Sequence, residues 1–125
     1  MLPGASVVAL NDGSGTPNRM QTIALVRREY IKRESGVIDM PNRVFYPYRH
    51  NYVDTEFYCT ALARGALVEC PDSVVVHRHP DWGHAQDDAT YQRGQETLSE
   101  DRETFSARAH LWQDLGVLDV AAASV

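Results

Sequence analysis

Short apolar runs separated by polar, turn-forming residues predict a small domain that mixes strands and helices. SVVAL (6–10) and QTIALV (21–26) are rich in β-branched residues, so each predicts a strand, and the loop NDGSGTPN separates them. ALVEC (66–70) and VVVHRH (74–79) predict two more strands, with the turn formers PDS between them. The strands therefore fall in two pairs, one near the start of the chain and one past its middle.

Two helical patterns lie between the two pairs of strands. RREYIKRES predicts a short helix that ends at Gly36, with its basic residues on a solvated face. DTEFYCTALARG (54–65) predicts the clearest helix, which Asp54 or Thr55 caps at its start and Gly65 at its end.

The C-terminal third predicts two further helices, whereas residues 37–52 predict neither helix nor strand. DATYQRGQETL (88–98) predicts a short helix and SEDRETFSARAHLWQDLG (99–116) a longer one, with Phe105, Ala109 and Trp112 on one face. Residues 37–52 are irregular and aromatic. The order of elements predicts an α/β fold without the regular βαβ alternation of a complete doubly wound sheet.

Composition narrows the class of protein. We expect the 125 residues to form one domain, 1–125, with 117–125 as a flexible tail. A net charge of −5 argues against nucleic-acid binding, and no apolar run is long enough for a membrane span. Two cysteines do not make a disulfide framework, so we expect reduced thiols in a cytoplasmic protein; a single disulfide between them is the alternative.

Three of the five histidines fall in VVVHRHPDWGH (74–84). If the strand persists, His77 and His79 point to the same face about 7 Å apart, a spacing at which two imidazoles share a divalent cation. HRHPD also fits the start of the HxHxDH signature of metal-dependent hydrolases, but Trp82 stands where the last histidine belongs. The alternative is that these histidines bond to neighbours at a strand end without metal.

A longer stretch resembles a known family. GVID (36–39), the aromatic FYPY (45–48), the acidic VDTEF (53–57), ALARG (61–65) and PDSVVVH (71–77) follow one another in the order and at the spacing of one family's motifs. On these residues the chain resembles the C-terminal, acceptor-side half of family-2 glycosyltransferases, which have the GT-A fold. The strand and helix of TIALVRREYI extend the resemblance toward the N-terminus.

The resemblance implies an inverting transfer of a sugar from a nucleotide-sugar donor to an acceptor hydroxyl. Asp54 is then the catalytic base, and its place at a helix start favours the ionised form. His77, with His79 beside it, is implied to contact a divalent metal (Mn²⁺ or Mg²⁺) or the diphosphate of the donor.

The acidic motif and the aromatic loop supply the expected substrate-binding residues. Glu56 matches the second acid of the motif, and either supports a substrate or stabilises the first turn of its helix. Tyr48, Arg49 and His50 precede the base and suit stacking on a sugar or holding a charged acceptor. The alternative for these three is an exposed loop, and for Asp54 a helix cap without a catalytic role.

The departure from the family is large. The βαβ unit that binds the nucleotide and the Asp-x-Asp metal motif belong to the family's N-terminal half, and neither is present in these residues. We therefore expect a partial GT-A-like mixed sheet with flanking helices, lacking the N-terminal nucleotide-binding half. Such a half exposes an apolar face and a sheet edge, so we expect a homo-oligomer or a missing half as partner. A non-catalytic binding module of this lineage and a metal-dependent hydrolase built on HRHPD are the alternatives.

Overall fold

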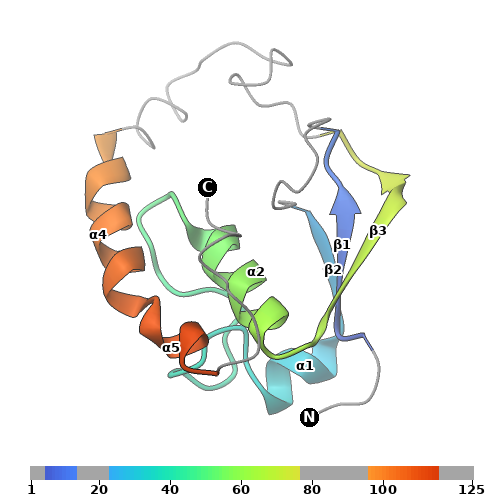
Figure 1. The fold of residues 1–125 in the computed structure, drawn as a ribbon, viewed down its shortest axis with the longest axis horizontal. Coiled ribbons are helices and arrows are strands. Elements are labelled where there is room, and N and C mark those ends of the chain that lie inside the picture. Colours follow the sequence, from blue (N-terminus) through green and yellow to red (C-terminus); the bar gives the residue numbers. More distant parts are fainter. Residues whose placement is uncertain (1–4, 14–22, 77–95, 116–125) are drawn as a thin grey trace.

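The computed structural model describes residues 5–13, 23–76 and 96–115 of the chain (Figure 1). These residues form a mixed α/β structure, which confirms the expected fold class at that level. The elements, in chain order, are β1 Val7–Asn11, β2 Ala24–Val26, α1 Arg28–Arg33, α2 Val53–Ala63, β3 Leu67–Val74, α4 Leu98–Arg108 and α5 His110–Gln113.

The described strands form one three-stranded mixed sheet in the order β2-β1-β3. β1 pairs antiparallel with β2 and parallel with β3. Val8 lies opposite both Leu25 and Val68, so these three residues form one row across the sheet on one face. Val7, Val26 and Leu67 form the neighbouring row on the other face.

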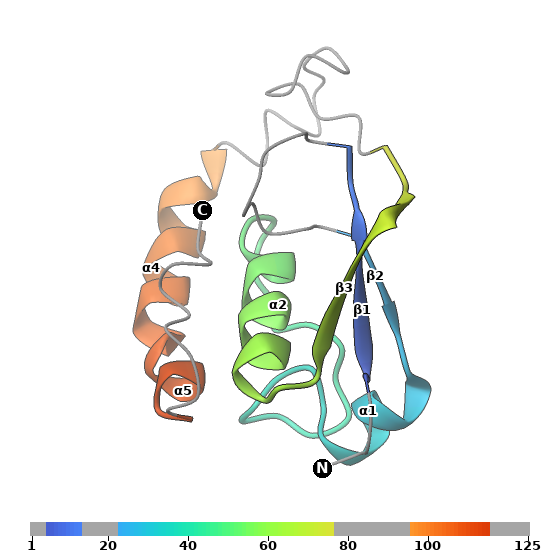
Figure 2. The same ribbon diagram turned by 45° about the vertical axis from the view of Figure 1, so that its right-hand side comes forward.

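Helix α2 is the centre of the structure. It lies between the sheet and the C-terminal helices α4 and α5 (Figures 1 and 2). It is buried on nearly all sides, with Phe57 and Ala61 toward the sheet and Cys59 and Ala63 toward α5. Burial around most of a helix, here including the polar Thr55, Glu56 and Thr60, is typical of a helix packed between two layers.

Two hydrophobic clusters hold α2 in place. The first joins the sheet and α1 to α2 through Val7, Tyr30, Phe57, Ala61 and Ala66. The second joins α2 to the C-terminal helices through Cys59, Ala63 and Trp112, with Phe105 and Ala109 packed against it. The expected apolar face Phe105–Ala109–Trp112 is confirmed, and the rings of Phe105 and Trp112 lie 5.2 Å apart.

The expectation of a turn between two separate strands at residues 71–73 is wrong, because these residues lie inside β3. Leu10 pairs with Cys70 and Asn11 with Val74, so the register shifts and three residues of β3 bulge outward. The side chain of Asn11 donates to the Pro71 carbonyl oxygen at 3.1 Å and holds the bulge. A proline is tolerated here because β3 is an edge strand among the described strands.

The expected helix 99–116 is divided in two. α4 ends at Arg108 and α5 begins at His110. Nδ1 of His110 lies 3.0 Å from the Ala107 carbonyl oxygen, an acceptor that an uninterrupted helix uses for the amide four residues on. Most of the other expected C-terminal helix, 88–98, lies outside the described residues.

The ends of α2 differ in how well the sequence predicts them. The helix begins one residue before Asp54, with Tyr52 as N-cap in the left-handed region (φ 67°), so neither Asp54 nor Thr55 is the cap. At the other end Gly65 has φ 71°, which confirms the expected glycine C-cap.

The segment 37–52 contains no helix and, apart from an isolated bridge between Val37 and Met40, no strand, as expected. Its start is fixed by Ser35, whose side chain bonds to the backbone of Met40 and Arg43. Gly36 packs so closely that a Cβ there would overlap the Val44 carbonyl oxygen and touch the ring of Phe57. This tight turn sends the chain back across α2.

Candidate functional site

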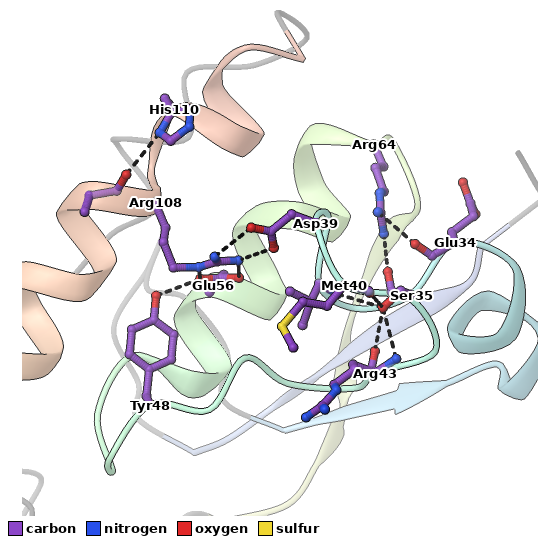
Figure 3. A network of polar contacts seen from close by, with 12 residues as sticks. Glu34, Ser35, Asp39, Met40, Arg43, Tyr48, Glu56, Arg64, Arg108 and His110 are labelled. Atoms are coloured by element: carbon purple, nitrogen blue, oxygen red, sulfur yellow. Dashed lines mark hydrogen bonds and ion pairs between the residues drawn. The ribbon is translucent and has the colours of Figure 1, made fainter.

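A buried arginine joins three parts of the chain that are far apart in sequence. Arg108, on α4, donates two hydrogen bonds to Asp39 at 2.8 and 3.0 Å and two to Glu56 at 2.8 and 3.0 Å (Figure 3). The Tyr48 hydroxyl donates to the same Glu56 carboxylate at 2.7 Å, and the guanidinium carbon lies 3.6 Å from the centroid of the Tyr46 ring. We call these five residues the Arg108 cluster.

The surroundings within the Arg108 cluster favour the ionised forms of Asp39 and Arg108. Hydrogen bonds from Arg108 hold the pKa of Asp39 below its ordinary value. Burial lowers the pKa of Arg108, but the bonds to Glu56 and Asp39 outweigh it and raise the pKa overall. Burial and the bond to Glu56 raise the pKa of Tyr48, which therefore remains a hydroxyl donor. The Glu56 side chain is 2% exposed and that of Arg108 11% exposed, so solvent screens their interaction little.

A second carboxylate on α4 fixes the turn before α2. Asp101 is 1% exposed and accepts the backbone N–H groups of Arg49, His50 and Asn51 at 2.7–2.9 Å. Burial raises the pKa of Asp101, but these three donors outweigh it and leave the pKa below its ordinary value. The ionised carboxylate therefore determines the path of the chain into α2.

Side chains reinforce this connection between α4 and the turn. Arg49 forms an exposed ion pair with Glu100 at 3.1 Å, and the Tyr52 ring stacks on Phe105 with centroids 4.8 Å apart. The stacking supports Tyr52 in its left-handed conformation, which otherwise costs about 1–2 kcal/mol. The first turn of α2 is thus held by α4 rather than by a side-chain cap.

Asp54 and Glu56 lie two positions apart in this first turn and face different surroundings. Glu56 points into the Arg108 cluster, whereas Asp54 borders a cavity of about 300 Å³ between α2, the sheet and residues 44–45. One carboxylate oxygen of Asp54 accepts the Thr55 N–H at 2.9 Å. Among the described residues that line this cavity, Asp54 is the charged one.

The rest of the cavity wall is mostly apolar. Its main contributors are Val7, Val26, Val44, Phe45, Phe57 and Leu67. Val26, Val44 and Phe45 are 37–48% exposed, which is high for large apolar side chains that gather around one opening. Tyr58 also borders the cavity, but its hydroxyl donates to Glu69 at 2.9 Å. We call this feature the apolar cavity.

The structure separates the expected substrate-binding residues from the expected base. Tyr48 and Glu56 bond to each other within the Arg108 cluster. Arg49 pairs with Glu100, and His50 is exposed with its backbone N–H bonded to Asp101. None of these four residues lines the apolar cavity. Of the expected site residues that the structure describes, Asp54 lines it.

The expected metal ligands cannot be placed, because His77 and His79 lie outside the described residues, as does the rest of HRHPD. Within residues 5–13, 23–76 and 96–115, no group of three or more His, Cys, Asp or Glu side chains is arranged to hold a metal ion. Burial raises the pKa of Cys59 to about 12, so this thiol is not a reactive nucleophile near neutral pH.

Sequence reasoning missed Asp39, Asp101 and Arg108, yet one signal for the last two is present. Asp101 and Arg108 occupy positions i and i+7 of the stripe that contains Phe105, Ala109 and Trp112. Charged residues on the buried stripe of an amphipathic helix indicate buried partners. No comparable signal in the sequence identifies Asp39 as the partner.

Comparisons of the chain with protein-family models, with curated proteins and with solved structures find no match.

Replacing Arg108 by methionine should strongly destabilise the fold, because Glu56 is then left buried without its cation. We expect the free energy of unfolding, measured by urea denaturation, to fall by about 3–5 kcal/mol. Arg33→Met is the matched control, since Arg33 is 67% exposed and pairs with Glu29 at 3.6 Å. It should change the free energy by less than about 1 kcal/mol. Equal effects of the two substitutions would contradict a central role for the Arg108 cluster.

Proposed function

We propose that this chain is the acceptor-side part of an inverting glycosyltransferase with a GT-A-like fold, and that Asp54 is its catalytic base. The observation that carries the proposal is the position of Asp54, in the first turn of α2 and at the wall of the apolar cavity. The order and spacing of GVID, FYPY, VDTEF, ALARG and PDSVVVH support it.

The proposed chemistry needs one carboxylate beside the acceptor. Asp54 takes the proton of the acceptor hydroxyl as its oxygen forms a bond to the anomeric carbon of the donor sugar. The bond from that carbon to the nucleoside diphosphate breaks on the opposite side, and the diphosphate leaves with the electron pair. The amides at the start of α2 favour the ionised form of Asp54, which is the form that a base requires.

The Arg108 cluster and Asp101 have a positioning role in this proposal. Asp101 fixes residues 49–51, and Glu56 anchors the first turn of α2 to α4. Both contacts constrain the backbone on either side of Asp54. A base must be held within hydrogen-bonding distance of the proton that it removes, and a rigid helix start meets this need.

The remaining components of the proposal lie outside the described residues or outside the chain. A divalent metal, Mn²⁺ or Mg²⁺, would neutralise charge on the leaving diphosphate, with His77 and His79 as its proposed contacts. The nucleotide-sugar donor would bind mainly to the nucleotide-binding half that these residues do not include. No helix in the described part of the chain is long and apolar enough to cross a bilayer. Separately, we propose a cytoplasmic location.

A non-catalytic binding module is the second candidate. Glu56, the second acid of the motif, has its carboxylate bonded to Arg108 and Tyr48 rather than directed at the apolar cavity. A module that binds a ligand without transferring a sugar requires only the cavity and the rigid scaffold around it.

Nucleotide titration and the Asp54→Asn substitution test the proposed function together. We expect Mn²⁺ to bind weakly by calorimetry and more tightly when a nucleoside diphosphate is present. Asp54→Asn should leave this binding unchanged, because Asp54 contacts the acceptor rather than the donor. It should lower sugar transfer, assayed with the nucleotide-binding half added, by roughly 100-fold or more, because a general base contributes that much.

The matched control is Asp72→Asn, since Asp72 is exposed on β3 and outside the cavity lining. It should leave both binding and transfer unchanged. Absence of nucleoside diphosphate binding, even with the other half present, would rule out the transferase. Nucleotide binding with equal transfer in both variants would rule out Asp54 as base.

We also propose a partner for the outer face of the sheet, which we define as the row Val8, Leu25 and Val68. Leu25 is 63% and Val68 49% exposed. Helices α2, α4 and α5 lie together on one side of the sheet (Figure 2), and this row lies on the face opposite to Val7, which packs toward α2. β2 and β3 are edge strands with no described partner on their outer sides. We propose that a second copy packs on this face when the chain is alone, and that the nucleotide-binding half packs there when it is present.

Sedimentation velocity should show self-association of the chain, because face-to-face packing of two sheets removes the Leu25 and Val68 side chains from water. Leu25→Lys combined with Val68→Lys should convert the dimer to a monomer with little loss of stability. Val44→Lys, an exposed apolar position on the other side of the sheet, should leave the dimer intact. A wild-type chain that sediments as a monomer at micromolar concentration would contradict this proposal.

A further inference from the structure

The size of the apolar cavity limits what binds beside Asp54. Its volume is about 300 Å³, whereas an engineered apolar cavity of about 150 Å³ in a protein binds benzene. The space therefore accommodates one six-membered aromatic ring together with a short substituent. An extended oligosaccharide does not fit within it.

The wall of the cavity matches an aromatic ring better than a sugar. The rings of Phe45 and Phe57 border the cavity and meet edge to face, with centroids 5.6 Å apart and planes at 73°. Phe45 is 48% exposed, so about half of its surface is open to solvent. A third ring in the cavity would continue the edge-to-face packing that aromatic side chains prefer.

The side chains that line this cavity offer few partners to replace the hydrogen bonds that a sugar makes to water. Valine, leucine and phenylalanine side chains offer neither donor nor acceptor, and the Tyr58 hydroxyl is bonded to Glu69. Each hydroxyl buried without a partner is costly. The carboxylate of Asp54 accepts a hydrogen bond, so a ligand with one hydroxyl on an apolar body is the best chemical match.

We propose that the apolar cavity is an acceptor site for a small aromatic alcohol, such as a phenol with a short alkyl group. This inference rests on the proposed function for the role of the ligand as acceptor, but its binding needs neither donor nor metal. The ring lies between Phe45, Phe57 and the valines of the sheet, and the hydroxyl faces Asp54. In the transfer step that hydroxyl oxygen becomes the glycosidic oxygen and Asp54 takes its proton.

Binding of 4-ethylphenol to the chain, followed by NMR chemical shifts or calorimetry without donor or metal, tests the proposal. We expect 4-ethylphenol to bind at least tenfold more tightly than ethylbenzene, because ethylbenzene lacks the hydroxyl, and methyl glucoside not to bind. Asp54→Ala should remove the preference for 4-ethylphenol over ethylbenzene.

Two adjacent positions of β2 provide a matched pair of variants. Ala24 borders the cavity, whereas Leu25 lies on the opposite face of the sheet and is 63% exposed. Ala24→Trp should fill the cavity and weaken 4-ethylphenol binding at least tenfold, and Leu25→Trp should leave binding unchanged. Equal effects of the two substitutions would place the ligand elsewhere and overturn the proposal.

The outcomes separate this inference from the proposed function. If nucleoside diphosphate binds and methyl glucoside, but not 4-ethylphenol, occupies the cavity, the transferase proposal stands and the aromatic acceptor is wrong. If 4-ethylphenol binds as expected and no nucleoside diphosphate does, the aromatic site is supported and the transferase fails. Failure of all three small probes to bind would overturn the site itself.

Discussion

The ion pairs of Arg108 with Glu56 and Asp39 are the interaction on which the rest of the structure depends. They join α4, α2 and the irregular segment 37–52, which share no backbone hydrogen-bonding ladder (Figure 3). Two carboxylates and one guanidinium carry a net charge of −1, and the Tyr48 hydroxyl donates to the excess acceptor. Because the Glu56–Arg108 pair is almost fully removed from water, removing either partner leaves the other charge buried without a counter-charge.

This constraint gives the site its geometry. Asp101 fixes the turn that leads into α2, and Glu56 fixes the side of α2 that faces α4. The opposite side of the same helix turn then presents Asp54 to the apolar cavity. A carboxylate positioned in this way, beside mostly apolar walls, suits the removal of a proton from a bound hydroxyl.

Local patterns in the sequence predicted the elements better than their connections. The β1 and α2 segments and the glycine cap at residue 65 follow from apolar periodicity and turn chemistry. The bulge in β3 was not predictable, because it depends on the register between Asn11 and Val74. Asp39 was equally hidden, since its partner is 69 residues away, whereas Asp101 and Arg108 were marked by their place on an otherwise apolar stripe.

A double-mutant cycle on Glu56 and Arg108 tests the central claim most directly. The free energy of unfolding is measured for the wild type, Glu56→Leu, Arg108→Met and the double variant. We predict a coupling energy of about 2–3 kcal/mol, with the double variant less destabilised than the sum of the single ones, because removing both charges leaves neither buried alone. A coupling energy near zero would contradict the claim that this ion pair holds α2 and α4 together.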